Sequence, residues 1–226
     1  MALKIYGHPS SICTRRVRTI LEEKGVEYEF INVNFLQGEH LSEPYGSAWH
    51  PFKKIPVLVD TEADIKVFES RAIAQYIAAK YHGYGPDLSP PQDDLKKFAA
   101  FQQALSIELS YFDPNVGGIA GEAVFKPAMG FGPGDQAVIK TKLDALDTAL
   151  QGYERILSQQ RYLAGDEITL ADLFHLPFGG LVEPLGFGEL VAKYPAVEKW
   201  WNGLKGRESW KKVGANEQEL GARGSQ

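Results

Sequence analysis

The first 82 residues switch repeatedly between the spacing of a strand and the spacing of a helix. Apolar and polar side chains alternate, or form short apolar runs, in four segments: residues 3–6, 26–34, 55–60 and 65–69. Apolar side chains three or four positions apart mark two helices, at residues 13–24 and 70–81. The predicted order is therefore β-α-β, a long loop, and β-β-α.

Beyond a Gly- and Pro-rich stretch at residues 82–94, nearly all of the chain has helical spacing. Two long amphipathic helices are predicted, from Leu95 to Phe112 and from Ile139 to Leu157. Thr169 and Asp172 fit a capping box at the start of a later helix, which is a signal of folding and not of function. The expected domains are an α/β domain at 1–82, a linker at 83–91 and an all-helical domain at 92–226.

Composition narrows the class of partner. The chain has 226 residues, 44% of them hydrophobic, which suffices for a substantial core. The net charge is −5 and basic residues alternate with acidic ones, so we expect neither nucleic acid nor an anionic membrane as a partner. No apolar run approaches the roughly 20 residues of a membrane span, and no signal peptide is recognisable. A single cysteine excludes an intramolecular disulfide, and a cytosolic location is expected.

The order of local motifs resembles that of the glutathione transferases, in particular their phi class, over nearly the whole chain. The motifs are "GHPSSICTRR" at 7–16, "GEH" at 38–40, "HPFKKIP" at 50–56, "ESRAIAQYIA" at 69–78, "FDP" at 112–114 and "YLAGDEITLADL" at 162–173. The resemblance implies a thioredoxin-like domain followed by an all-helical one, in a homodimer. It also implies conjugation of glutathione to hydrophobic electrophiles, with glutathione-dependent reduction of peroxides as a further activity.

The resemblance assigns part of the glutathione site to the start of the third strand and to the helix after the fourth. It implies a cis Ile55–Pro56 bond, with the backbone of Ile55 pairing with the cysteinyl backbone of glutathione. From the residues alone, Pro56 could equally be a trans proline at a strand start. Ser70 is a natural N-cap. The resemblance adds that Ser70 holds the γ-glutamyl carboxylate and that Glu69 faces the ammonium group.

A glutathione thiol, with a pKa near 8.5, must be stabilised as the thiolate before it can react. The resemblance gives this role to Ser11, whose hydroxyl would donate to the sulfur at the start of the first helix. Ser10 is the nearest alternative, and either serine could serve only as an N-cap. Cys13 is interpreted as a buried apolar residue, although glutathionyl exchange through its thiol stays open. We interpret His8 as a structural group and not as a base.

The chain departs from the family at the other end of the tripeptide. His40 and Lys54 are the candidates for binding the glycyl carboxylate, because Leu41 stands where the family usually has lysine. Lys53 and Lys54 likewise replace the usual Gly-Gln before the proline. No metal site is expected from the spacing of the histidines, and no cofactor beyond glutathione as co-substrate.

The electrophile is expected in an apolar cleft between the domains. The candidates for lining it are Ile12, Phe35, Phe112, Val116 and Phe178. The Gly-rich segment 116–135 is expected to form either a mobile lid or a disordered bridge between helices. Trp49 is the candidate aromatic anchor of the homodimer, or else packs within its own subunit. The rival function is a non-catalytic carrier of hydrophobic small molecules.

Overall fold

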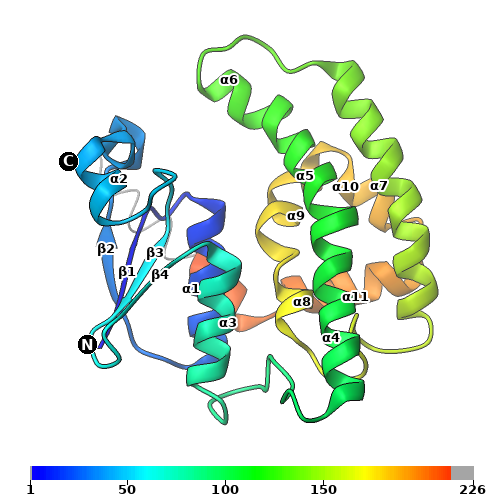
Figure 1. Ribbon diagram of the computed structural model, residues 1–226. Coiled ribbons are helices and arrows are strands. Elements are labelled where there is room, and N and C mark those ends of the chain that lie inside the picture. Colours follow the sequence, from blue (N-terminus) through cyan, green and yellow to red (C-terminus); the bar gives the residue numbers. More distant parts are fainter. Residues whose placement is uncertain (1, 215–226) are drawn as a thin grey trace. The chain divides into compact units, whose positions relative to one another are not determined.

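The computed structural model describes residues 2–214, which form two compact units (Figure 1). Among the described residues, the first unit comprises residues 2–87 and 208–214, and the second comprises Leu88–Arg207. Hydrogen bonds to two backbone carbonyls explain where the boundary between the units lies. The Lys24 ammonium donates to the Pro86 carbonyl at 2.8 Å in the first unit, whereas the Leu170 amide donates to the Leu88 carbonyl at 2.9 Å in the second. The chain thus changes units between Asp87 and Leu88.

The first unit has the expected thioredoxin-like order. Its main elements are β1 (Leu3–Gly7), α1 (Ile12–Lys24), β2 (Glu29–Asn32), α2 (Glu43–Ala48), β3 (Val57–Asp60), β4 (Ile65–Phe68) and α3 (Ser70–Lys80). The sheet order is β2-β1-β3-β4, in which β1 is parallel to β2 and antiparallel to β3, and β3 is antiparallel to β4. The predicted β-α-β and β-β-α halves are confirmed.

Helices α1 and α3 pack against each other on one side of this sheet (Figure 1). Their inward positions are apolar and fully buried, as are the facing strand residues. This core holds the start of α1 and the start of α3 in fixed positions. The fully buried members are Ile5, Val17, Ile20, Leu21, Val57, Leu58, Ile73 and Ile77.

A buried carboxylate closes the end of this core. Asp60, at the end of β3, accepts hydrogen bonds from the Tyr76 hydroxyl at 2.7 Å and from the Lys80 ammonium. Its other oxygen accepts the amides of Glu62 and Ala63. Burial alone would raise the pKa of Asp60, but these hydrogen bonds lower it on balance from 3.8.

We expect Asp60→Asn to destabilise the first unit in a pH-dependent way. Because the folded-state pKa of Asp60 is lowered, its contribution to stability is present above 3.8 and is lost as pH falls through the folded-state value. Urea denaturation of both proteins at pH 7, at pH 4 and at pH values between 4 and 2 measures this, because the loss is expected only below 3.8. The difference in unfolding free energy should narrow toward the lower pH, and a constant difference would contradict the role given to the ionised carboxylate.

Apart from one isolated β-bridge between Tyr162 and Gly165, the regular secondary structure of the second unit is helical, as expected. Its elements are α4 (Leu95–Ile107), η3 (Glu108–Phe112), α5 (Asp113–Ala120), η4 (Gly121–Phe125), α6 (Lys126–Ala128), α7 (Gln136–Leu157), α8 (Leu170–Leu173), α9 (Leu176–Val182), η5 (Glu183–Leu185), α10 (Phe187–Val191) and α11 (Pro195–Lys205). Elements η3 and η4 are single π-helical turns, so the expected helix over 95–112 contains a π-turn and continues to Ala128. No helix within residues 2–214 is both long and apolar enough to cross a membrane.

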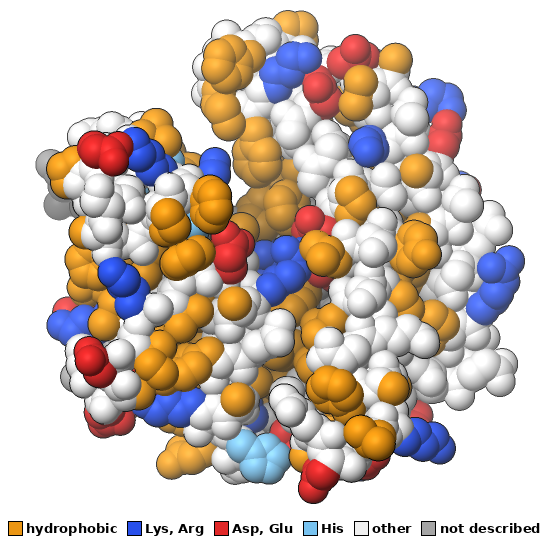
Figure 2. Space-filling view, viewed as in Figure 1, with side chains coloured by type: hydrophobic (Ala, Val, Ile, Leu, Met, Phe, Trp, Pro, Cys, Tyr) orange, Lys and Arg blue, Asp and Glu red, His pale blue; other side chains and the backbone are white. Residues whose placement is uncertain are grey.

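The Gly-rich segment 116–135 is mostly helical, and a disordered bridge is therefore the wrong description of it. Its turn is closed by Glu122, whose carboxylate accepts from the Lys126 ammonium and from the Asp135 amide, both at 2.8 Å. A Cβ at Gly134 would lie 2.3 Å from the Glu122 carbonyl oxygen, so glycine is required there. Met129 and Phe131 are exposed at the tip, where Figure 2 shows hydrophobic side chains gathered over α6 and the turn after it.

The predicted capping box at the start of α8 is confirmed. The Asp172 carboxylate accepts the Thr169 amide at 2.9 Å. The same buried carboxylate also accepts the Leu163 amide and the Trp200 indole N–H, both at 3.0 Å. Asp172 therefore joins the start of α8 to the preceding loop and to α11.

The helical domain was expected to continue to the end of the chain, but residues 208–214 form a helix that packs with the first unit. The Lys212 ammonium pairs with the Glu22 carboxylate at 2.6 Å, and Ser209 donates a hydrogen bond to Glu23. The Arg15 guanidinium lies 4.5 Å from the ring centre of Trp210. These polar and cation–π contacts with α1 account for the difference.

Candidate active site

Ser11 is the N-cap of α1, directly after the loop that leaves β1. Its hydroxyl oxygen accepts the Thr14 amide at 3.3 Å, and its own amide donates to the His8 carbonyl at 3.0 Å. The side chain is half-buried. Since the hydroxyl oxygen accepts the capping bond, its proton can be donated to another group at the positive end of the helix dipole. Ser11 thus combines the capping role with an available donor.

Ser10 differs from Ser11 in its surroundings. It is exposed, and its hydroxyl lies 2.7 Å from His8 Nδ1, which also accepts the Ser10 amide at 3.3 Å. Burial lowers the pKa of His8, which favours the neutral ring. His8 is therefore a hydrogen-bonded structural group, as expected, and it engages the Ser10 hydroxyl locally.

A buried arginine connects the start of α1 to the start of α3. Arg16 is 1% exposed, and its Nη1 donates to the Ser70 hydroxyl oxygen at 2.8 Å and lies 3.7 Å from Cys13 Sγ. Cys13 is half-buried, so it is less enclosed than the sequence indicates. Because the Ser70 oxygen accepts from a charged donor that has no acceptor of its own, the Ser70 hydroxyl proton points to a different partner.

Glu69, the residue before α3, faces His50 from an earlier loop. Glu69 has φ of 70° and is the N-cap position of α3, so Ser70 is the first helical residue and not the cap that the sequence predicts. His50 Nε2 lies 3.8 Å from Glu69 Oε1. His50 Nδ1 accepts the Phe52 amide at 3.2 Å, so in the neutral ring the proton is on the nitrogen that faces Glu69.

The Ile55–Pro56 peptide bond is cis, as the resemblance implies. It immediately precedes β3, and both residues are buried. Within residues 2–214 the N–H and C=O of Ile55 have no hydrogen-bond partner, whereas the Lys54 carbonyl accepts the Tyr45 hydroxyl at 3.1 Å. The loop directly before β3 therefore presents unpaired backbone groups at Ile55.

His40 and Lys54 lie near each other beside this loop. His40 is 7% exposed and its ring stacks on Phe35, with centroids 4.5 Å apart. Burial lowers the pKa of His40, and the nearby positive charge of Lys54 lowers it further. His40 Nδ1 is buried without a hydrogen-bond partner among residues 2–214. His40 is thus a neutral hydrogen-bonding group, and the charge at this end belongs to the exposed Lys54.

The predicted residues of the first unit lie along one continuous series of neighbours. His8 and His40 both contact Phe35, with ring centroids 6.1 and 4.5 Å away. Burial lowers the pKa of His40 and of His50, the charge of Lys54 lowers both further, and His50 faces Glu69. Ser70 directly follows Glu69 and accepts a hydrogen bond from Arg16, which belongs to α1. The fold therefore brings Ser11, His40, Lys54, Ile55, Pro56, Glu69 and Ser70 to one region of the first unit.

The expected apolar lining residues differ in how much surface they present. In the second unit, Phe112 and Val116 are fully buried, and the Phe112 ring packs against His175 and Phe187 with centroids 4.4 and 5.5 Å apart. Phe178 is half-buried. In the first unit, Ile12 is buried beside Ser11, and Phe35 is half-buried against His40. Phe112 and Val116 therefore pack within the core of the helical unit.

Two residues that sequence reasoning did not select are Arg16 and His50. Arg16 has no identifying local pattern, because it is one of three arginines within four positions, at 15, 16 and 18. The burial of Arg16 and its contact across 54 positions in the chain become visible only in the fold. For His50 a signal existed, because it is the first residue of the motif "HPFKKIP" at 50–56. Within residues 2–214, no group of histidine, cysteine or acidic side chains is arranged to hold a metal ion.

Comparison with known proteins gives consistent matches along the chain. Residues 1–79 match the glutathione S-transferase N-terminal domain, and residues 112–208 match the glutathione S-transferase C-terminal domain. Glutathione S-transferase F10 of Arabidopsis thaliana is 42% identical over 216 residues, which cover 95% of this chain and 97% of that protein.

Solved structures agree in fold over nearly the same length. Glutathione transferase F7 from Populus trichocarpa is 36% identical with a TM-score of 0.88, and the match covers 95% of this chain and 99% of that one. Glutathione S-transferase I from maize, in complex with an atrazine glutathione conjugate, is 32% identical with a TM-score of 0.86. That match covers 96% of this chain and 99% of the maize chain.

Proposed function

Because this chain belongs to the glutathione S-transferase family, with phi-class relatives, we propose that it conjugates the glutathione thiolate to hydrophobic electrophiles. The observation that carries the proposal is the position of Ser11. Its hydroxyl caps α1 through the oxygen and keeps its proton for a further acceptor. That acceptor is the glutathione sulfur, which the hydroxyl and the helix dipole stabilise as the anion.

The reaction needs the thiolate and no further base in the transfer step. The thiol proton leaves to solvent on binding, because Ser11 lowers the thiol pKa below its free value of about 8.5. With an aryl halide, the sulfur forms a bond to the ring carbon and the halide departs with the bonding electrons. With a hydroperoxide, two glutathione molecules would be oxidised to the disulfide while the peroxide is reduced to an alcohol and water. Ser11 acts as a donor in both reactions and is not a nucleophile.

The γ-glutamyl end of glutathione is assigned to Glu69 and Ser70. Arg16 donates to the Ser70 oxygen, which directs the Ser70 hydroxyl proton toward the ligand carboxylate. The positive charge of Arg16 beneath the same carboxylate adds to this attraction. Glu69 faces the ligand ammonium, and His50 Nε2 lies 3.8 Å from the Glu69 carboxylate.

The remainder of the tripeptide is assigned to the loop directly before β3 and to His40 and Lys54 beside it. The N–H and C=O of Ile55, before Pro56, would pair with the cysteinyl backbone of glutathione as an added strand. At the glycyl end, His40 provides a neutral hydrogen bond and Lys54 provides the charge that Leu41 lacks. Two of the apolar candidates belong to the first unit, where Ile12 follows Ser11 and Phe35 stacks on His40. Phe178, in the second unit, is half-buried and so keeps some exposed surface.

The class of electrophile is supported by one relative. The maize structure holds the glutathione conjugate of atrazine, and such a conjugate forms when glutathione displaces a leaving group from an aromatic ring. We assign this chain the same chemical class, aromatic rings that carry a leaving group. A steady-state assay with 1-chloro-2,4-dinitrobenzene, alongside an isothiocyanate and cumene hydroperoxide, tests the assignment.

A non-catalytic carrier is the alternative that this assay separates from the enzyme. Glutathione affinity and conjugation rate are measured on the same preparation, together with binding of a hydrophobic dye. We expect micromolar to millimolar glutathione binding and a conjugation rate well above the solution reaction. Tight dye binding with conjugation no faster than in buffer would identify a carrier and overturn the proposed function.

Cys13→Ser is expected to leave conjugation within about twofold of the wild type. The Cys13 thiol is half-buried beside Arg16, and the proposed reaction uses the glutathione sulfur alone. The same variant is assayed with a mixed disulfide of glutathione. Loss of aryl halide conjugation in Cys13→Ser would contradict the role of Ser11. Loss of mixed-disulfide activity alone would show a second, thiol-exchange activity.

His50→Asn is expected to raise the KM for glutathione about three- to fivefold with little change in kcat, because an oriented partner of Glu69 is lost. The pH profile gives a second readout. Burial lowers the pKa of His50 from 6.5, the Glu69 carboxylate opposes this shift, and the charge of Lys54 adds to it. Below that lowered value, a charged His50 competes with the glutathione ammonium for Glu69.

Wild-type KM should therefore rise in acid more steeply than the KM of His50→Asn, which has no titrating group at this position. Steady-state kinetics of both proteins from pH 5.5 to pH 8 measure the difference. If KM changes with pH in the same way in both proteins, or if the KM of His50→Asn at pH 7 equals that of the wild type, His50 has no role in glutathione binding.

A homodimer is proposed on the basis of the family alone, and its anchor needs a new candidate. Trp49 packs within its own subunit, where its ring centroid lies 4.2 Å from that of Tyr6 and 5.8 Å from the Lys66 ammonium. The exposed aromatic of this loop is Phe52, at 69% exposure. Phe52 is therefore the better candidate for an intersubunit contact, and sedimentation of Phe52→Ala against the wild type tests it.

A further inference from the structure

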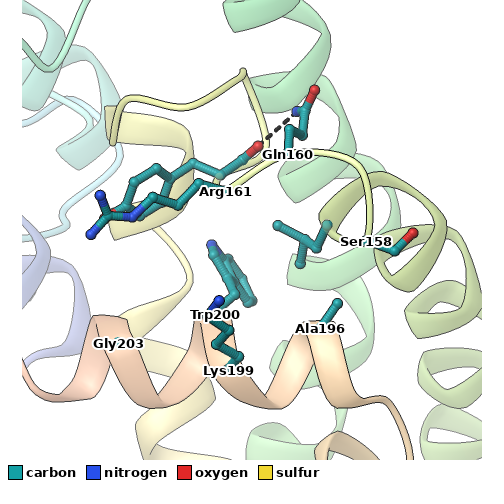
Figure 3. A pocket seen from close by; sticks show the side chains of 9 residues that line it. Ser158, Gln160, Arg161, Ala196, Lys199, Trp200 and Gly203 are labelled. Carbon is teal, nitrogen blue, oxygen red and sulfur yellow. Dashed lines mark hydrogen bonds between the residues drawn. The ribbon is translucent and has the colours of Figure 1, made fainter.

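The residues assigned to glutathione all belong to the first unit. The cavity between the C-terminal end of α7 and α11 belongs to the second unit, and none of those residues lines it (Figure 3). Tyr45, in α2 of the first unit, contacts two of them. Its hydroxyl donates to the Lys54 carbonyl at 3.1 Å, and its side chain packs in one apolar cluster with Ile55. Tyr45 is therefore in direct contact with the loop that precedes β3.

Tyr45 is held in place by its packing and by its backbone. It is 5% exposed and belongs to a buried apolar cluster against which Trp49 packs. Its carbonyl accepts the Trp49 amide at 2.8 Å and the His50 amide at 3.3 Å. Burial raises the pKa of Tyr45 to about 12, and the Glu39 carboxylate adds to this shift. The hydroxyl is therefore a fixed and protonated donor at neutral and moderately alkaline pH.

The hydrogen bond from Tyr45 fixes the orientation of a whole peptide group. The Lys54 carbonyl and the Ile55 N–H belong to the same peptide group, whose atoms lie in one plane. The bond between these two residues is trans, so the carbonyl and the N–H point in opposite directions. A donor that holds the carbonyl therefore sets the direction of the N–H, which has no partner within residues 2–214. It also strengthens the N–H as a donor, because linked hydrogen bonds polarise one another.

From this geometry we propose that Tyr45 is a positioning residue for glutathione, an inference that rests on the proposed function. Its hydroxyl orients the Lys54–Ile55 peptide group so that the Ile55 N–H donates to the cysteinyl carbonyl of the ligand. Without the hydroxyl, the Lys54 carbonyl gains a hydrogen bond only by turning toward water, and the N–H turns with it. Tyr45 itself touches neither glutathione nor the reacting atoms. Its loss therefore weakens binding and leaves the transfer step unchanged.

The test compares Tyr45→Phe with the wild type and with a matched control, Tyr76→Phe. Each substitution removes one hydroxyl and keeps the ring, so the packing around it is preserved. Tyr76 belongs to α3 of the same unit, and its hydroxyl donates to the Asp60 carboxylate at 2.7 Å. Calorimetry gives the Kd for S-methylglutathione, and urea denaturation gives the stability of each protein. Steady-state kinetics with 1-chloro-2,4-dinitrobenzene give kcat and the KM for glutathione.

A second ligand separates the orientation of the Ile55 N–H from a general disturbance of the site. It is an analogue of S-methylglutathione in which a methylene group replaces the cysteinyl carbonyl. This analogue has no acceptor for the Ile55 N–H but keeps both ends of the tripeptide. A loss of affinity caused by a misdirected N–H should therefore appear with S-methylglutathione and be absent with the analogue. A general disturbance would appear with both ligands.

We expect Tyr45→Phe to bind S-methylglutathione about fivefold more weakly, with a similar rise in the KM for glutathione and kcat within about twofold of the wild type. The analogue should bind the wild type and Tyr45→Phe equally, and Tyr76→Phe should lose stability without losing affinity for either ligand.

Three results would overturn this role of Tyr45: an unchanged affinity of Tyr45→Phe for S-methylglutathione, an equal loss with both ligands, or an equal loss in Tyr76→Phe. A wild type that binds S-methylglutathione but does not conjugate would overturn the proposed function alone, and the same affinities would still decide the role of Tyr45. A wild type that binds neither ligand would overturn both.

Discussion

Replacing Ser11 by alanine is expected to slow conjugation of 1-chloro-2,4-dinitrobenzene about 100-fold or more. The loss follows from removing a preorganised donor to a charged sulfur, an effect of that size in other enzymes. The KM for glutathione should change little, because the groups assigned to its two ends are untouched. Steady-state kinetics at varied glutathione, with a saturating electrophile, separate kcat from KM.

The same substitution also removes the N-cap of α1, so a matched control is needed. Ser42 caps α2 in the same unit, and its hydroxyl accepts the Tyr45 amide at 3.3 Å, the distance found between Ser11 and the Thr14 amide. Each alanine variant should lose about 1 kcal/mol of stability. Only Ser11→Ala should lose turnover. Equal activity in the two variants would mean that Ser11 is a cap and nothing more.

Asp172→Ala is expected to destabilise the chain by about 3 kcal/mol, the largest stability effect that we predict. Four donors converge on this buried carboxylate: the amides of Leu163 and Thr169, the Thr169 hydroxyl and the Trp200 indole. Removing the acceptor leaves buried donors without partners at Leu163, at Thr169 and at Trp200 in α11. Equilibrium unfolding in urea measures the change.

Asp172→Asn sharpens this prediction. Each carboxylate oxygen accepts two of the four donors, and the amide nitrogen of asparagine can accept none of them. The asparagine variant should therefore lose nearly as much stability as the alanine variant. Asp144→Asn is the control, because Asp144 is exposed and pairs only with Lys140 one turn away. A mild effect of Asp172→Asn, similar to that of the control, would contradict the account of this network.

The fold was largely predictable because each half of the chain has a dominant period. Strand alternation and helical spacing gave the elements of the first unit, apart from α2. That helix is six residues long and contains Pro44 and Gly46, so it has little helical pattern. Its signals were Ser42 as the cap and a proline in the first turn. The π-turns in 108–112 and 121–125 preserve apolar spacing well enough to be invisible in the sequence.

The site was predictable where a motif and a local structural signal coincide. Ser11 caps a helix and Pro56 directly precedes a strand, and both signals are short-range. His40 illustrates the limit, because its burial against Phe35 and its lowered pKa depend on the folded loop. Arg16 shows the same limit more strongly, since its partner Ser70 is 54 positions away. Contacts of this kind have no local pattern from which to predict them.

The most direct test of the account is the pKa of the glutathione thiol bound to the protein. Ultraviolet absorbance of the thiolate, followed against pH in the binary complex, measures it for the wild type and for Ser11→Ala. The account predicts a bound thiol pKa well below the free value of about 8.5 in the wild type, and a return toward that value in the variant. Identical titrations in the two complexes would contradict stabilisation of the thiolate by Ser11.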